Sequence, residues 1–239
     1  MFYFTVCFPS CSPRLTSIFF DENNFERNIA KQEALTNTSV VKLQANTGYS
    51  FLVPMAIHNS SICKGLDRGM RIQIIVQNPW SVNAILTLLR KNDFNGDREY
   101  TSYLSNRLPV DRLMEAYLES HWLNERLNVC FKYYLKLKKA YPKQIELRLS
   151  NRVLSNSILL TDSYLFFEPY ISMLEMDKKD IAFFEIQIPN NNALYTETND
   201  YFDKLWKTSY KYHIYKKSEH LLRQQVKNYF EKEAYESDS

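Results

Sequence analysis

The residues of this chain best placed to bind or transform a substrate lie in the stretch 150–170. We single out Ser155, Ser157 and Asp162 among its polar side chains. Two short apolar runs flank the turn-forming residues 161–163, and polar residues between hydrophobic runs predict a β-hairpin. A serine hydroxyl with no adjacent base is a poor nucleophile and carries no positive charge. We therefore expect this hairpin to bind a ligand, with no catalytic residue among these three.

The hairpin resembles the core of phospholipase D-like proteins, whose signature is HxKxxxxD. With Asp162 at the Asp position, Ser155 stands at the His position and Ser157 at the Lys position. In that family the His takes up the phosphoryl group and the Lys holds its charge. The resemblance therefore implies the family's fold with a degenerate active site.

The order of motifs between residues 39 and 206 is similar to that of single-copy, degenerate phospholipase D-like domains of bacterial proteins. The shared motifs are Gly-Tyr-Ser at 48–50, Asn-Pro at 78–79, Glu-Pro-Tyr at 168–170 and FDKLW at 202–206. The resemblance implies an α/β/α sandwich with a mixed sheet. It also allows a regulatory role, in which such domains often occur.

Composition excludes several classes of protein. The chain has 239 residues, an apolar fraction of 45% and only 4 glycines, and it contains no GxGxxG or GxxxxGK[ST] loop for phosphates. The apolar run at the start stops at Pro9, too early for a signal peptide or a membrane span. The four scattered cysteines favour a reducing cytoplasm, and the Cys7–Cys11 pair lacks a second pair to complete a metal site. We expect no cofactor and no metal.

The pattern along the chain predicts a leader at 1–37, a phospholipase D-like domain at 38–217 and a helical tail at 218–239. Strands are expected at 39–45, 70–77, 144–149, 157–160, 164–167 and 181–188. Helices are expected at 21–35, 51–57, 79–89 and 110–141, and then from Tyr201 and from Ser218. Ser50 and Asn78 are the expected N-caps of the second and third helices.

The strand-helix-strand-helix order of residues 39–89 predicts parallel strands with helices that begin at the strand ends. Free backbone amides at such an end favour an anion, although most α/β proteins bind nothing there. The polar segment 91–107 is the expected mobile loop over this crevice. The candidate ligand-binding residues are Ser50, Asn78, Arg148, Arg152, Ser155, Ser157 and Asp162.

Residues 204–227 carry seven Lys or Arg against one acid, Glu219, with three tyrosines interleaved. Single-stranded nucleic acid binds to basic side chains with aromatics, but a solvated basic helix face with inward aromatics gives the same pattern. The net charge of +3 and the pI near 8.5 are low for a nucleic-acid-binding domain, so any such surface is local. The candidate contacts are Lys204, Lys207, Lys211, Lys216 and Lys217.

Three functions stay open at this point. The first is a non-catalytic regulatory or binding module that senses an anionic ligand, either a nucleotide or a nucleic acid. The second is a phosphodiesterase or nuclease, which needs an imidazole brought to the pocket by folding or by a homodimer, from His58, His121, His213 or His220. The third is an interaction scaffold that uses a tyrosine-rich surface.

Overall fold

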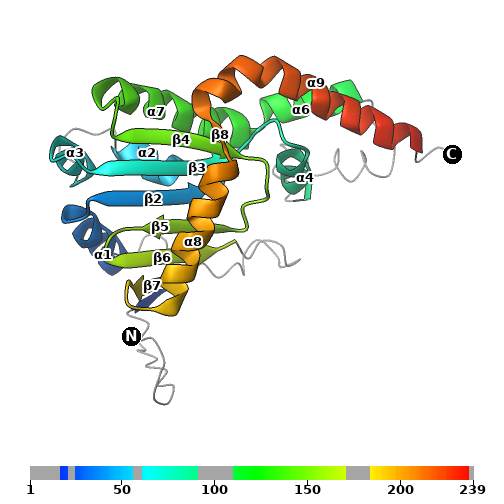
Figure 1. Cartoon of the computed structure of the whole chain (residues 1–239). Helices are drawn as coiled ribbons and strands as arrows, with labels where there is room; N and C mark the ends of the chain where they lie inside the picture. Colours follow the sequence, from blue (N-terminus) through cyan, green and yellow to red (C-terminus); the bar gives the residue numbers. More distant parts are fainter. Residues whose placement is uncertain (1–16, 21–24, 56–60, 91–109, 171–183, 237–239) are drawn as a thin grey trace, which may run out of the picture.

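The structure is a computed structural model, and it describes residues 17–20, 25–55, 61–90, 110–170 and 184–236. Within these residues one eight-stranded sheet has the order β1-β7-β6-β5-β2-β3-β4-β8 (Figure 1). Strands β2, β3 and β4 are parallel, and the remaining pairs are antiparallel. The strands are β1 (Ser17–Phe19), β2 (Val40–Ala45), β3 (Arg71–Gln77), β4 (Ile145–Ser150), β5 (Asn156–Leu160), β6 (Tyr164–Pro169), β7 (Glu185–Pro189) and β8 (Tyr210–Lys211).

Helices cover both faces of this sheet, so the predicted α/β class with a mixed sheet is confirmed. Figure 1 shows α8 lying across one face. The central strand β3 carries apolar side chains on both faces of the sheet, since Ile74 packs into one core cluster and Ile75 into the other. Both faces must therefore be covered by helices. The helices are α1 (Phe25–Thr36), α2 (Tyr49–Met55), α3 (Ser61–Asp67), α4 (Val82–Arg90), α6 (Val110–Glu119), the π-helix η1 (Trp122–Leu127), α7 (Asn128–Ala140), α8 (Ala193–Thr208) and α9 (Tyr212–Glu236).

The single helix predicted for residues 110–141 is wrong, because the chain forms α6, η1 and α7 in succession. The break falls at Ser120. Its hydroxyl donates to the carbonyl of Tyr117 at 2.7 Å and accepts from the backbone N–H of Leu123 at 3.3 Å. A serine that bonds to local backbone in this way competes with the helix ladder.

The two C-terminal helices begin earlier than predicted. Helix α8 starts at Ala193, because the side chain of Asn192 accepts from the backbone N–H of Leu194 at 2.8 Å and caps the first turn. Helix α9 starts at Tyr212, directly after the two-residue strand β8. The predicted starts at Tyr201 and Ser218 are therefore wrong.

Both predicted N-caps are also wrong. Helix α2 already includes Ser50, and the carbonyl of Gly48 accepts from the N–H of Leu52 at 2.9 Å. Helix α4 is capped by Ser81, whose hydroxyl accepts from the N–H of Ala84 at 3.2 Å. Asn78 instead caps the preceding turn, accepting from the N–H of Trp80 at 3.0 Å.

The flanking segments are packed against the sheet. Strand β1 pairs with β7, and α1 is held to β7 by Arg27 and Lys31, which both bind Glu185. Near the other end of the chain, Val226 and Phe230 of α9 belong to the larger core cluster. The division at residues 37 and 217 stays a prediction.

No helix in the described ranges is long and apolar enough to cross a membrane.

Candidate functional site

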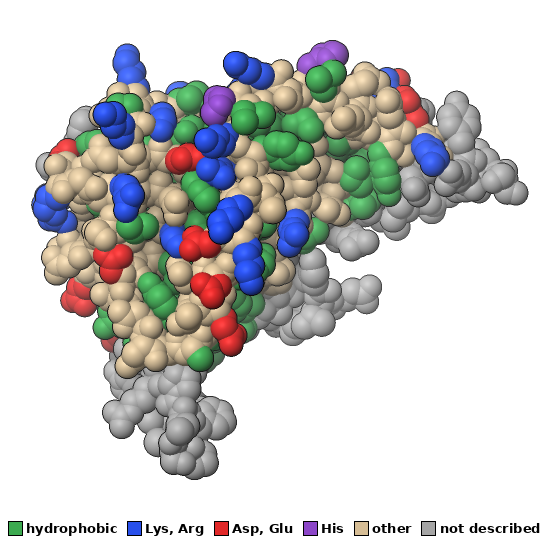
Figure 2. Space-filling model, viewed as in Figure 1, with side chains coloured by type: hydrophobic (Ala, Val, Ile, Leu, Met, Phe, Trp, Pro, Cys, Tyr) green, Lys and Arg blue, Asp and Glu red, His purple; other side chains and the backbone are tan. Residues whose placement is uncertain are grey.

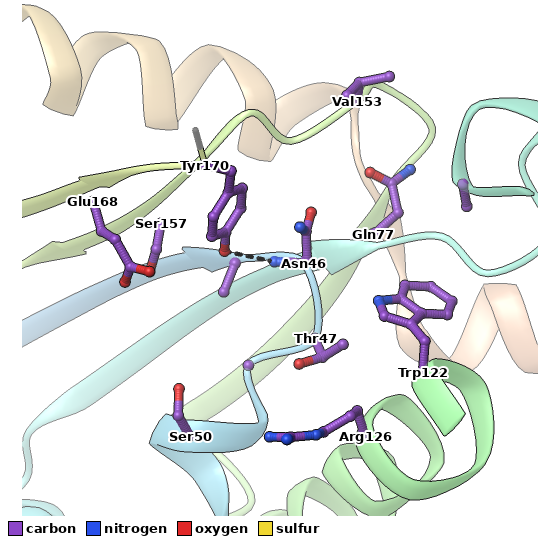
Figure 3. Close-up of a pocket in the computed structure, with 13 residues that line it drawn as sticks. Asn46, Thr47, Ser50, Gln77, Trp122, Arg126, Val153, Ser157, Glu168 and Tyr170 are labelled. Carbon is purple, nitrogen blue, oxygen red and sulfur yellow. Dashed lines mark hydrogen bonds between the residues drawn. The ribbon is translucent and has the colours of Figure 1, made fainter. Parts of the chain in front are cut away.

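A pocket of about 290 Å³ opens where β2 and β3 end, which is the edge of the sheet predicted to form the crevice (Figure 3). This is the end at which open α/β sheets place their ligands. Its volume is close to the lower limit of small-molecule sites. Asn46 and Gln77 stand at the ends of the two strands and line the pocket.

The wall formed by the hairpin carries three polar side chains. Ser157 of β5 and Glu168 of β6 are register partners, and Tyr170 follows β6. The hydroxyl of Tyr170 accepts from the backbone N–H of Asn46 at 3.2 Å. Burial raises the pKa of Tyr170 to about 12, although hydrogen bonds from Asn46 and Ser157 oppose the shift. Tyr170 is therefore a neutral phenol at physiological pH.

A tight turn brings α2 to the opposite wall. Gly48 has φ +66°, and a Cβ added there would lie 3.3 Å from the Val76 side chain. Only glycine accepts this backbone conformation without strain at so close an approach. The turn places Thr47 and Ser50 in the lining.

The π-helix η1 supplies the remaining wall through Trp122 and Arg126. Single π-helical turns are uncommon and often lie at functional sites. The guanidinium of Arg126 lies 4.8 Å from the centre of the Tyr49 ring, and its Nε donates to Nε2 of His121 at 3.2 Å. Figure 3 shows its terminal nitrogens extending toward α2 across the pocket. Two contacts thus fix the orientation of this cation.

The structure brings two of the seven predicted ligand-binding residues, Ser50 and Ser157, into this pocket. Asn78 is fully buried, and its amide donates to Asn151 at 2.7 Å. Ser155 is exposed beyond β5, where its carbonyl accepts from the N–H of Tyr170. A binding role for each of these residues stays a prediction.

Asp162 lies at the opposite end of the hairpin from the pocket. Its carboxylate accepts from the backbone N–H of Ser39 at 2.6 Å and from its hydroxyl at 2.8 Å. Its own N–H donates to Thr38 at 3.0 Å. These bonds join the hairpin turn to the start of β2, so in this structure Asp162 has a structural role.

The two predicted arginine partners also lie outside the lining. Arg148 stacks on Trp206 with its guanidinium carbon 4.2 Å from the ring centre, and it donates to Glu146 at 2.9 Å. Because Trp206 belongs to α8, this contact lies on the far face of the sheet. Arg152 is exposed in the loop before β5.

Histidine placement bears on the enzymatic alternative. His121 lies beside the pocket, but its Nε2 accepts from Arg126 and its Nδ1 lies 2.8 Å from a carboxylate oxygen of Glu125. His213 and His220 are exposed on α9. His58, the predicted loop 91–107 and the Cys7–Cys11 pair lie outside the described residues.

Sequence reasoning missed Trp122, Arg126 and Tyr170 as lining residues. The first two lie on what was predicted to be an ordinary amphipathic helix, where an exposed Arg is unremarkable. Tyr170 was noted only as part of a shared motif. The Glu-Pro-Tyr ending of the hairpin was thus the signal in the sequence that could have identified Tyr170, next to the predicted Ser157 on the same wall.

The predicted basic face is exposed over α8, β8 and the start of α9. Figure 2 shows Lys and Arg side chains gathered there, with several acids among them. Two of the three interleaved tyrosines, Tyr212 and Tyr215, are buried, and Tyr210 is 41% exposed. The exposed lysines are Lys204, Lys207, Lys211, Lys216 and Lys217.

No family model matches this chain, and no curated protein matches it in sequence. One similar solved structure is TrmBL2, an archaeal chromatin protein with a novel mode of DNA binding, at 15% identity and TM-score 0.42, covering 81% of this chain and 53% of that one. This chain therefore spans about half of that protein. Another is Nuc, a phospholipase D family member from Salmonella typhimurium, at 10% identity and TM-score 0.39, covering 82% and 96%. Both TM-scores are below 0.5, so the function proposed below rests on the chain's own residues.

Proposed function

We propose that this chain is a non-catalytic, phospholipase D-like binding module that senses an anionic ligand, a nucleotide or nucleic acid, in the pocket between η1 and the hairpin. The observation that carries the proposal is the orientation of Arg126. Its Nε donates to His121, and its guanidinium carbon lies 4.8 Å from the centre of the Tyr49 ring. No hydrogen bond to its two terminal nitrogens comes from the described part of the chain.

A guanidinium held in this way suits a phosphate or carboxylate. Its terminal N–H groups form a planar fork that binds two oxygens at once. Because the side chain is already ordered, less rotamer entropy is lost on binding. The hydroxyls of Ser50 and Ser157 add neutral donors within the same pocket.

The lining favours binding over turnover. Among the described residues that line the pocket there is no His, Lys or Cys. His121 already bonds Arg126 through one ring nitrogen and faces Glu125 through the other, so it is not placed to activate Ser50 or Ser157. A phosphodiesterase would need a base from elsewhere, for example from a second copy of the chain.

Calorimetric titration with inorganic phosphate, ribose 5-phosphate, nucleoside monophosphates and short single-stranded DNA and RNA, at two salt concentrations, tests the proposal. We expect Arg126→Gln to weaken the bound anion about 10- to 100-fold, as for loss of charge-assisted hydrogen bonds. Arg152→Gln is the matched control, because Arg152 is exposed and outside the lining. Equal loss in both variants, or no binding of any of these anions, would overturn the proposal.

A turnover assay with a generic phosphodiester separates the enzymatic alternative. We expect no hydrolysis by the wild-type chain. Hydrolysis that disappears in His121→Ala would establish the alternative, and light scattering would then show whether a homodimer assembles the site.

The basic face supports a second mode, contact with a nucleic-acid backbone. Its five exposed lysines are well placed for phosphates, but two of its three tyrosines pack inward and offer no base a stacking surface. Binding there would be sequence-independent and strongly salt-dependent. Replacing Lys204, Lys207 and Lys211 by Glu should then abolish nucleic-acid binding and leave mononucleotide binding unchanged.

A further inference from the structure

The π-helix η1 and its N-cap bring three titratable side chains into one series of contacts. Residues three and four apart are neighbours on an α-helix, whereas the i→i+5 bonds of a π-helix bring residues five apart to the same side. Nε of Arg126 therefore reaches Nε2 of His121 at 3.2 Å, and Nδ1 of the same ring lies 2.8 Å from a carboxylate oxygen of Glu125. His121 thus stands between an acid and the cation of the pocket.

These two contacts assign the single proton of a neutral His121 ring. Nε of an arginine always carries a hydrogen, so Nε2 of His121 accepts from Arg126 and has no hydrogen of its own. The ring proton then lies on Nδ1, where Glu125 accepts it. A protonated imidazole carries a hydrogen on both nitrogens and accepts from neither side. The contact between His121 and Arg126 therefore exists only while the ring is neutral.

We propose that His121 is a proton-controlled positioning residue, which holds Arg126 in its anion-binding orientation when neutral and releases it when protonated. This inference rests on the proposed function, because it concerns the regulation of the same anion site. Imidazoles usually change charge between pH 5 and 8. Protonation would place two like charges 3.2 Å apart, so the guanidinium would turn away. Anion binding then weakens in mildly acidic conditions.

A positive charge on His121 would also attract the anion, so the sign depends on which effect is larger. The imidazole contacts Nε of Arg126, whereas the terminal nitrogens, which extend toward α2 in Figure 3, are the ones left for the ligand. The attraction therefore acts across the guanidinium. Water screens it further, since the side chains of His121 and Glu125 are 48% and 70% exposed. Loss of the hydrogen bond that orders a charged group is the larger effect.

The neighbouring elements add no other charged contact to His121. Helices α6 and α7 both pack against η1. Within the described residues, neither Glu119 of α6 nor Lys132 of α7 forms an ion pair or hydrogen bond with the ring. From α2, Tyr49 approaches the guanidinium of Arg126. Glu125 and Arg126 are therefore the groups that set how easily His121 takes up a proton.

Calorimetric titration with sulfate and with the thymidine dinucleotide TpT tests the inference, because neither anion changes its charge between pH 5 and 8. We expect the wild-type chain to bind both about 5- to 10-fold more weakly at pH 5.5 than at pH 8, as for loss of one hydrogen bond. By linkage, binding near pH 6.5 should release protons. The measured enthalpy should then depend on the ionisation enthalpy of the buffer.

Substitutions separate the proton from the shape of the ring. His121→Gln keeps an acceptor that does not titrate, so it should bind as the wild type does at pH 8 and show no pH dependence. His121→Leu has no acceptor and should bind weakly at every pH. Glu125→Gln should move the midpoint of the profile to lower pH, because the carboxylate favours the protonated ring. His213→Gln, at an exposed imidazole on α9, is the matched control and should keep the wild-type profile.

The outcomes distinguish this inference from the proposed function. If the anions bind at pH 8 and Arg126→Gln weakens them, but the wild-type affinity is the same at pH 5.5, the anion site stands and the role of His121 falls. A wild-type pH profile in His121→Gln also overturns that role. If neither anion binds at pH 8, this inference falls, and the proposed function falls with it unless one of its own probe anions binds. The wild-type profile and the proton release need no substitution, so they decide the question even if a variant fails to fold.

Discussion

Replacing Glu185 by Gln should be among the most destabilising conservative changes in this chain. The Glu185 side chain is 3% exposed, and its oxygens accept from Arg27 at 2.9 and 3.0 Å and from Lys31 at 2.6 Å. Gln keeps the shape but removes the charge, which leaves two cations facing each other in a mostly buried site. Burial already lowers the pKa of Lys31, which shows how poorly its charge is solvated there.

The magnitude follows from this burial. Breaking a buried ion pair by removing one partner costs about 3–5 kcal/mol. Arg27 and Lys31 keep 14% and 22% of their side chains exposed, so part of their solvation can be recovered. We therefore expect a loss near the lower end, about 3 kcal/mol, or roughly 6–12 °C in Tm for a chain of this size.

Urea unfolding followed by tryptophan fluorescence measures this loss. Glu146→Gln is the control, because Glu146 pairs with Arg148 at the same 2.9 Å but is 40% exposed. It should cost less than about 1 kcal/mol. If Glu185→Gln costs no more than Glu146→Gln, the reasoning from burial is refuted. Replacing the three charged residues together by Leu, Met and Met should recover most of the stability.

Three further predictions concern stability and pH. Gly48→Ala should cost about 1–3 kcal/mol in urea unfolding, because an L-residue at φ +66° is strained and its Cβ would crowd Val76; loss of less than 0.5 kcal/mol would contradict this. Burial raises the pKa of Tyr170 and of Tyr212 to about 12. The stability that the two neutral phenols confer is therefore complete below pH 10 and is lost between pH 10 and 12. Absorbance at 295 nm, which reports tyrosine ionisation, and the urea midpoint should change over the same pH range. Burial would raise the pKa of Glu219, but hydrogen bonds from Lys216, Arg223 and Trp80 outweigh it and lower the pKa. The stability that Glu219 contributes is therefore complete above pH 4.5 and is lost as the pH falls below it. Glu219→Gln should remove this acid dependence and change the fluorescence of Trp80, whose indole N–H donates to Glu219.

The strands of the sheet could be predicted from the sequence because their signals are local. Residues 71–77 alternate between two buried faces, and the hairpin has its turn residues between apolar runs. Helix starts were less predictable. Asn192 caps α8 ahead of the polar residues 196–200, which themselves look like a helix start. A helix cap can be predicted from a few neighbouring residues. The burial of Thr198, by contrast, depends on the whole fold and cannot be predicted from its neighbours.

The candidate site was only partly predictable. Ser50 was predicted because a helix was expected to begin there after a strand end at the crevice, and Ser157 because it stands at the Lys position of the HxKxxxxD signature. Arg126 was not, because its role depends on a π-turn and on Tyr49 from a segment more than seventy residues earlier. Asp162 shows the opposite case: it stands at a motif position, but its carboxylate accepts from Ser39 and its backbone N–H donates to Thr38.

The order of strands in the sheet also constrains how the chain can fold as it leaves the ribosome. Strand β2 pairs on one side with β3, soon after it in sequence, but on the other side with β5. The bond between Ser39 and Asp162 joins residues 123 positions apart. At about 5–20 residues per second, synthesis of that interval takes on the order of ten seconds. During this delay one edge of β2 has no strand to pair with, and an unpaired edge is prone to aggregate with other chains. We therefore expect the nascent chain to depend on a chaperone until β5 is synthesised.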